Sequence, residues 1–108
     1  MARRVARGEV WLYRFASPDK RRPVLVIGRP DALAAMHTAI VAPITSTVRE
    51  IGSQVRLGEA DGMKGPCAVS LDHIQIVRQA DLRTYVTTLR PEVMAGVCRA
   101  LAIATGCA

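Results

Sequence analysis

The chain has 108 residues, half of them apolar, which is enough for one domain with its own core and too apolar for a disordered tail. Its formal net charge of +6 and its pI of about 10.0 favour an anionic partner such as nucleic acid. Three cysteines without CxxC or Cys/His spacing exclude a zinc motif and fit a reduced, cytoplasmic setting. The basic start leads into a segment too short and too polar for a signal peptide or a membrane span, so we expect one domain over residues 1–108.

Short apolar runs separated by turn residues predict that most of the chain forms strands. In chain order, the expected strands cover residues 9–15, 23–27, 39–46, 53–57, 67–71, 73–77 and 85–89, and the fifth and sixth of these could be one long bent strand. Between the strands the sequence predicts loops over 17–20 and 58–66 and a short helix or turn over 30–37. The last segment, residues 90–106, predicts a helix. This order predicts a mainly β (α+β) domain, a small barrel capped by a helix.

Prolines and aromatic residues add detail to these strands. Pro23 opens its strand, where a missing N–H is tolerated, whereas Pro43 interrupts the third strand and argues for an edge or a bulge. In the first strand, Trp11, Tyr13 and Phe15 share one face. Aromatic residues on such a face can stack on bases, but they more often belong to a core or an interface.

The terminal helix carries one apolar face. Pro91 fits its first turn and Gly106 fits the position just past its end. The residues expected on the buried face are Val93, Val97, Leu101 and Ala104, beside Met94 and Cys98. The side chain of Cys98 is therefore expected to pack against the rest of the domain.

Polar residues that suit phosphate chemistry stand at two strand ends. Arg22 directly precedes Pro23, which keeps it extended, and its planar guanidinium matches phosphate geometry, although a solvated loop arginine is the commoner case. Thr45, Ser46 and Thr47 end the third strand, where hydroxyls either bind phosphate or cap a turn.

Asp72 and His73 are adjacent between two apolar runs. On a regular strand they would face opposite sides and could form no dyad unless a bulge intervened. The chain has no P-loop, GxGxxG or GxSxG motif. The residues alone therefore indicate a basic, single-domain β protein, for which nucleic-acid binding is one interpretation.

Several stretches, in order and at suitable spacing, resemble the MazF/PemK family of bacterial toxins: "RGEVWLYRF", "KRRPVLVIGR", "VAPITST", "AVSLDHIQIV" and "PEVMAGVCRALAIATG". The resemblance covers nearly the whole chain. It implies an SH3-like barrel of the CcdB/PemK type, with a C-terminal helix and a short helix between strands. It further implies a cytoplasmic homodimer with metal-independent endoribonuclease activity on single-stranded RNA and no cofactor, inhibited by a MazE-like antitoxin whose flexible segment occupies the RNA groove.

The resemblance also implies roles for particular residues. Arg22 and Thr45 match the family's functional arginine and threonine, and Asp72 matches an aspartate of the PemK branch. His73 stands where glutamine is common, and Ser70 stands where the PemK branch has an arginine. The residues expected to bind RNA are Lys20, Arg21, Ser46, Thr47 and Ser70.

The implied chemistry is attack by the RNA 2′-hydroxyl, which gives a 2′,3′-cyclic phosphate and a 5′-hydroxyl. Arg22 is expected to stabilise the charge of the phosphorane, because guanidinium does not readily deprotonate. Thr45 is expected to bind a non-bridging oxygen. Asp72 or His73 is expected to act as the base, and imidazole is the better match near neutral pH.

Two other functions remain open at this point. One is a gyrase-poisoning interaction protein of the CcdB type, which has the same fold but a Trp-Gly-Ile ending, whereas this chain ends "ATGCA". The other is a degenerate family member that binds RNA or antitoxin without cleaving. Arg22 and Thr45 argue against the degenerate member, and Ser70 argues for it.

Overall fold

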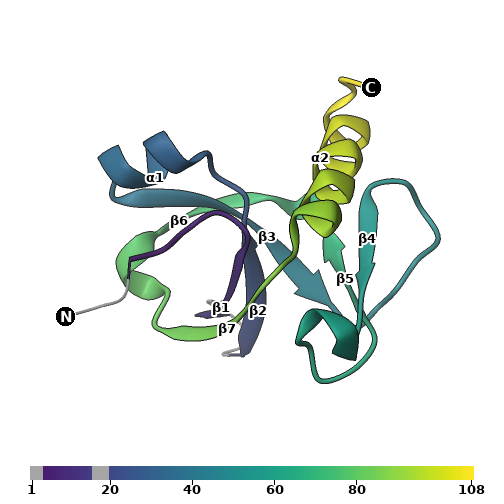
Figure 1. Ribbon diagram of the computed structural model, residues 1–108, viewed down its shortest axis with the longest axis horizontal. Helices are drawn as coiled ribbons and strands as arrows, with labels where there is room; N and C mark the ends of the chain where they lie inside the picture. Colours follow the sequence, from purple (N-terminus) through teal and green to yellow (C-terminus); the bar gives the residue numbers. More distant parts are fainter. Residues whose placement is uncertain (1–3, 16–19) are drawn as a thin grey trace.

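A computed structural model describes residues 4–15 and 20–108 of the chain (Figure 1). The strands are β1 (Glu9–Arg14), β2 (Arg21–Val26), β3 (Thr38–Thr45), β4 (Gln54–Leu57), β5 (Cys67–Ser70), β6 (Gln75–Arg78) and β7 (Thr84–Thr88). The helices are α1 (Pro30–Ala35) and α2 (Pro91–Thr105), and the 3₁₀ turns are η1 (Glu59–Asp61), η2 (Leu71–His73) and η3 (Gln79–Asp81). Every expected strand is present, and residues 67–77 form two strands separated by η2. Of the expected loop over 17–20, residues 17–19 lie outside the described ranges.

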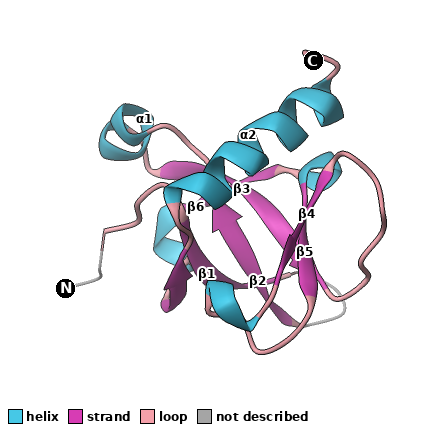
Figure 2. Ribbon diagram, turned by 45° about the vertical axis from the view of Figure 1, so that its right-hand side comes forward, coloured by secondary structure: helices cyan, strands magenta, loops and turns pink. Residues whose placement is uncertain are grey.

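The strands form one antiparallel sheet in the order β4-β5-β3-β2-β1-β7, with β6 paired to β3. In Figure 2, α2 runs across the curved sheet. The expected mainly β (α+β) small barrel with a C-terminal helix is therefore confirmed. Within the described part of the chain, no helix is long and apolar enough to cross a membrane.

Neither Pro23 nor Pro43 lies at the boundary of the sheet that the sequence predicted: Pro23 does not begin its strand, and Pro43 is not in an edge strand. Strand β2 begins two residues before Pro23, because Arg21 and Arg22 pair with β1. Pro43 is not at an edge, since β3 is an interior strand paired with β2 on one side. On its other side β3 pairs with β6 up to Val41 and with β5 from Ile44, so Pro43 falls in the gap between these two partners, where a missing N–H costs no ladder hydrogen bond.

The near-continuous apolar run of β2 is explained by burial on both faces of the sheet. Leu25 packs in one cluster with Val97 of α2, whereas Val24 and Val26 pack in another. The second cluster also contains Trp11, with Tyr13 and Phe15 packed against it, so the aromatic face of β1 belongs to a core. Successive residues of a strand point to opposite faces, and here each face has its own core.

One expectation for α2 is wrong, because Cys98 is exposed. Val97 and Ala100 are the buried residues of this helix, at a spacing of three. The stripe that packs on the sheet therefore passes through Ala100 and leaves Cys98 on the flank, where Arg7 Nη2 lies 3.2 Å from its sulfur.

The acidic residue at the start of β1 has a structural role. Glu9 is buried, and its Oε1 accepts hydrogen bonds from the Ala6 N–H at 2.8 Å and from Trp11 Nε1 at 3.1 Å. A buried carboxylate needs such donors, and the indole N–H needs an acceptor. Glu9 thus fixes both the entry into β1 and the orientation of Trp11.

Candidate active site

A cavity of about 340 Å³ lies where the start of β2, the end of β3, and β4 meet the segment that joins β5 to β6. Its lining contains most of the residues that the resemblance singled out. The lining residues are Arg22, Pro43, Ile44, Thr45, Thr47, Arg49, Gln54, Ser70 and His73.

Arg22 is held by the backbone of the β1–β2 hairpin. It is the second residue of β2, lies opposite Tyr13 in the register, and precedes Pro23, which restricts it to extended conformations. Its side chain is exposed and makes no hydrogen bond or ion pair with residues 4–15 or 20–108. Its donors are therefore available to an anion, while its backbone is fixed in the sheet.

Thr45, the last residue of β3, has its hydroxyl oriented by the turn that follows. Its Oγ1 accepts a hydrogen bond from the Thr47 N–H at 3.0 Å, so its own proton remains to be donated elsewhere. Gln54 of β4 braces the same turn. Its Oε1 accepts from the Arg49 N–H at 2.7 Å and its Nε2 donates to the Thr47 carbonyl at 3.3 Å.

Ser70 and His73 form a hydrogen-bonded pair. Ser70 Oγ lies 2.7 Å from His73 Nδ1, and Ser70 is only 6% exposed. The pair forms because the chain leaves β5 in a 3₁₀ turn, in which residues three apart lie on the same face. The sequence predicted strand alternation here, so this pairing was missed.

Asp72 points elsewhere. Its Oδ2 accepts a hydrogen bond from Ser53 Oγ at 2.5 Å, and it does not line the cavity. The 3₁₀ turn therefore separates Asp72 from its neighbour His73, as strand alternation would also have done.

Of the sequence-predicted residues, the structure brings together Arg22, Thr45, Thr47, Ser70 and His73. It leaves outside this cavity Lys20, Arg21, Ser46 and Asp72. Sequence reasoning missed Arg49 and Gln54. Gln54 reaches the cavity because β4 pairs with β5, where Gln54 lies opposite Ser70, and Gln54 holds the Arg49 N–H. The sequence signal that could have pointed to Arg49 is its position shortly after the hydroxyl-rich stretch of Thr45, Ser46 and Thr47.

The electrostatics of the cavity suit an anion. Among the described residues, its lining has two arginines and a histidine and no carboxylate. Guanidinium forks and a hydroxyl donor are the groups that bind phosphate oxygens. Across the described ranges, no group of three or more His, Cys, Asp or Glu side chains is placed to hold a metal ion.

The chain is similar to known proteins along nearly its whole length. Residues 6–105 match the family model described as "PemK-like, MazF-like toxin of type II toxin-antitoxin system". The chain is 38% identical over 103 residues to the probable endoribonuclease MazF5 of Mycobacterium tuberculosis, a match that covers 94% of each chain. Among solved structures it resembles the M. tuberculosis toxin MazF-mt6, with a TM-score of 0.81, 28% identity and coverage of 91% of this chain and 96% of that one.

A further likeness bears on the fold alone. A mycobacterial endoribonuclease, solved in complex with its cognate antitoxin, gives a TM-score of 0.86 at 24% identity, and the match covers 94% of this chain and 95% of that one.

Proposed function

The chain belongs to the PemK-like, MazF-like family of toxins of type II toxin–antitoxin systems, and we propose that it is an endoribonuclease that cleaves single-stranded RNA without a metal ion. The observation that carries this proposal is the convergence of Arg22, Thr45 and the Ser70–His73 pair on one cavity, in which no carboxylate is found among the described lining residues. The family assignment and this constellation argue against the gyrase-poisoning and non-cleaving alternatives.

The proposed reaction is an internal transfer within the RNA. The 2′-oxygen forms a bond to the adjacent phosphorus, and the bond from phosphorus to the 5′-oxygen of the next nucleotide breaks. The proton of the 2′-hydroxyl passes to a base on the protein, and the leaving 5′-oxygen takes up a proton. The products are a 2′,3′-cyclic phosphate and a 5′-hydroxyl, so no water and no cofactor enters the cleavage step.

Stabilisation of charge falls to Arg22 and Thr45. The phosphorane carries more negative charge than the starting phosphodiester, and donors fixed in advance at this position lower the barrier. Arg22 supplies a guanidinium on a sheet-held backbone, and Thr45 supplies a hydroxyl whose oxygen is already bonded to the Thr47 N–H. Arg49, on the braced turn, adds a second positive charge to the same cavity.

Proton transfer falls to His73. Because its Nδ1 is bonded to Ser70 Oγ, Nε2 is the ring nitrogen left to exchange a proton with RNA. For Nε2 to act as a base in the neutral ring, Nδ1 must carry the proton and donate it to Ser70. Asp72, the other candidate for the base, accepts a hydrogen bond from Ser53 and does not line the cavity.

The substrate is proposed to be single-stranded because a 2′-hydroxyl in line with its own phosphate requires a splayed backbone, which a regular RNA duplex does not offer. The antitoxin partner follows from the family. We expect it to compete with RNA through an acidic segment that is disordered when free. Toxin, antitoxin and RNA would then meet in the cytoplasm.

The homodimer is proposed to form through an exposed apolar patch on β3 and β6. Ile40 and Ile76 are opposite each other in the register of these strands and are 41% and 70% exposed. Met36, four residues before Ile40, and Ile74, two residues before Ile76, are also exposed. Within the described sheet, β6 pairs only with β3, so its free edge and this patch suit pairing with a second copy.

The proposal is tested by incubating RNA with the purified protein in EDTA and measuring the cleavage rate. Arg22→Ala should lower the rate by about 10²–10³-fold, the usual loss for one preorganised donor. Arg29→Ala is the matched control, since Arg29 is an exposed arginine paired with Asp31 that does not line the cavity. Equal rates for the two variants would reject the assignment of the site.

A further inference from the structure

The turn that carries His73 is held only partly by the core. The η2 turn begins where Ser70 ends β5, and its first residue, Leu71, is 1% exposed in the same cluster as Val97 of α2. His73, two residues further on, is exposed. The core therefore fixes the beginning of this turn and does not set where the imidazole lies.

Ser53, which lies just before β4, holds η2 with two hydrogen bonds. Its carbonyl accepts from the Leu71 N–H at 3.0 Å, and its Oγ donates to Asp72 Oδ2 at 2.5 Å. The second is a short bond between a hydroxyl and a carboxylate, which is stronger than a bond between neutral groups. Ser53 is only 6% exposed and Asp72 is exposed, so a buried hydroxyl holds the residue directly before His73.

The residue after Ser53 braces the other side of the cavity. Gln54 accepts from the Arg49 N–H at 2.7 Å and donates to the Thr47 carbonyl at 3.3 Å. Ser53 and Gln54 are consecutive, so one dipeptide holds both the turn that follows β3 and the turn that carries His73. This dipeptide therefore links the phosphate-binding side of the cavity to the side that exchanges the proton.

We propose that Ser53 is a positioning residue of the candidate active site, which acts through its hydrogen bond to Asp72 to keep the imidazole of His73 directed into the cavity. The inference rests on the proposed ribonuclease function. It gives Asp72 a role other than that of the base, because its carboxylate accepts a hydrogen bond from Ser53 and takes no proton from RNA. A catalytic group misplaced by about 1 Å can cost about 10²-fold in rate, so one hydrogen bond at this turn is enough to matter.

Steady-state kinetics separates this role from a purely structural one. In Ser53→Ala water can replace the hydroxyl at the exposed Asp72 carboxylate, so the variant is expected to fold. It should lower kcat by on the order of tenfold and leave KM unchanged, because Arg22 and Thr45 are held by other strands. Ser53→Thr keeps the hydroxyl and should restore most of the rate. Asp72→Asn keeps an acceptor oxygen, so it should lose no more than Ser53→Ala and keep the pH dependence of the wild type.

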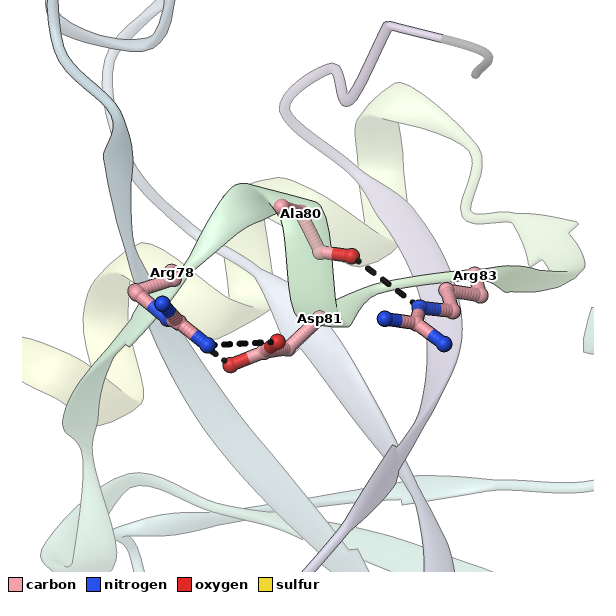
Figure 3. Close-up of polar contacts among 4 residues, drawn as sticks. All are labelled: Arg78, Ala80, Asp81 and Arg83. Atoms are coloured by element: carbon pink, nitrogen blue, oxygen red, sulfur yellow. Dashed lines mark hydrogen bonds and ion pairs between the residues drawn. The ribbon is translucent and has the colours of Figure 1, made fainter. Parts of the chain in front are cut away.

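The η3 turn provides a matched control. Like η2 it has three residues, and its aspartate, Asp81, is also held through its carboxylate. Figure 3 shows this carboxylate facing Arg78, with contacts of 3.2 and 3.3 Å, while Arg83 Nε donates to the Ala80 carbonyl beside it. None of these four residues lines the candidate active site. Asp81→Ala and Asp72→Ala therefore remove a carboxylate contact from two comparable turns, and only Asp72→Ala should lower kcat.

A spectroscopic measurement tests the same positioning without cleavage. The chain has two histidines, and His37 does not line the site, so side-chain ¹⁵N NMR of the free protein reads His73 with an internal reference. In the neutral ring of the wild type the proton is expected on Nδ1, bonded to Ser70. Ser53→Ala should raise the share of the Nε2–H tautomer of His73 and leave His37 unchanged.

Several results would overturn the inference. Wild-type kcat in Ser53→Ala, or an unchanged tautomer of His73, would show that the serine does not position the ring. Loss of cleavage and of its pH dependence in Asp72→Asn would make Asp72 the base. Equal losses of kcat in Asp72→Ala and Asp81→Ala would reduce the effect to turn stability. If the wild type cleaves no RNA, the proposed function fails, but the tautomer of His73 still tests the role of Ser53.

Discussion

The hydroxyl of Ser70 and the Nδ1 atom of His73 are 2.7 Å apart in the candidate active site. The serine is almost completely buried at the end of β5, whereas the imidazole is exposed on the following 3₁₀ turn. The buried hydroxyl therefore orients the exposed ring, and the ring presents Nε2 to the cavity.

Removing the imidazole should remove the proton transfer. His73→Gln is expected to lower kcat by about 10²–10⁴-fold and to flatten the pH–rate profile in the range where imidazole titrates, because glutamine cannot exchange a proton. The measurement is kcat and KM across pH for the wild type and the variant. A variant that keeps the wild-type profile would return Asp72 to consideration as the base.

Ser70 is expected to act as a positioning residue. Ser70→Ala should lower kcat by about tenfold with little change in KM, since the ring loses its anchor but remains present. Its pH dependence should persist in shifted form, and Ser70→Thr, which keeps the hydroxyl, should restore much of the rate. Wild-type kcat in Ser70→Ala would mean that the hydrogen bond does not orient the ring for catalysis.

Thr45 should be sensitive to loss of its hydroxyl and tolerant of a change in its methyl group. Thr45→Val is expected to lower cleavage by about 10²-fold, because it removes the donor to the phosphate and the acceptor for the Thr47 N–H. Thr45→Ser should stay within a few-fold of the wild type. Thr105→Val, on the far end of α2, makes the same change outside the site. A rate for Thr45→Val equal to that of this control would exclude the assigned role.

The proposed dimer depends on the exposed patch at Ile40 and Ile76. Ile76→Asp should shift the protein toward a monomer in light scattering, because it buries an unpaired charge in the interface. Ile103→Asp is the control, since Ile103 is 51% exposed on α2 and lies outside the patch. If Ile76→Asp associates as tightly as Ile103→Asp, the two copies pair through another surface.

Thiol reactivity should differ among the three cysteines. Burial, with a smaller contribution from the charge of Asp61, raises the pKa of Cys67 above 9.0. The thiolate is the reactive form, so iodoacetamide at pH 8 should modify Cys67 more slowly than the exposed Cys98 and Cys107, as peptide mass spectrometry would show. Equal rates for all three would contradict this burial.

The raised pKa of Cys67 also predicts how the free energy of unfolding changes with pH. A thiol whose folded pKa is raised stabilises the fold fully below the unfolded pKa, and this stability is lost as the pH rises through the folded value. The free energy of unfolding should therefore fall less steeply above about pH 9 in Cys67→Ala than in the wild type. Denaturant titrations at neutral and alkaline pH provide the comparison.

Local pattern was enough to predict the elements of this fold. Apolar runs bounded by glycine and proline marked the strands, and strand alternation placed Trp11 and Val10 on opposite faces. The resemblance singled out Arg22, Thr45 and Ser70, and the structure places all three in the lining of one cavity. The resemblance could not show how the chain turns after β5. There the 3₁₀ turn η2 brings residues three apart, Ser70 and His73, onto the same side.

Long-range pairings were equally hidden in the sequence. Pro43 is tolerated in an interior strand only because β3 changes partners beside it, which no local pattern reveals. Arg21 and Arg83 line one cavity although they are distant in sequence, because β1 lies between β2 and β7 in the sheet. Such arrangements follow from the closure of the whole sheet.

The central claim is that the 2′-hydroxyl of RNA is the nucleophile and that no metal ion takes part. The most direct test is mass spectrometry of the fragments that the purified protein releases, in EDTA, from an RNA oligonucleotide and from the same oligonucleotide with a single 2′-deoxy substitution at the mapped cleavage step. We predict 2′,3′-cyclic phosphate and 5′-hydroxyl ends from the first and no cleavage at that step in the second. Cleavage of the deoxy-substituted strand, or a 5′-phosphate end, would contradict the mechanism.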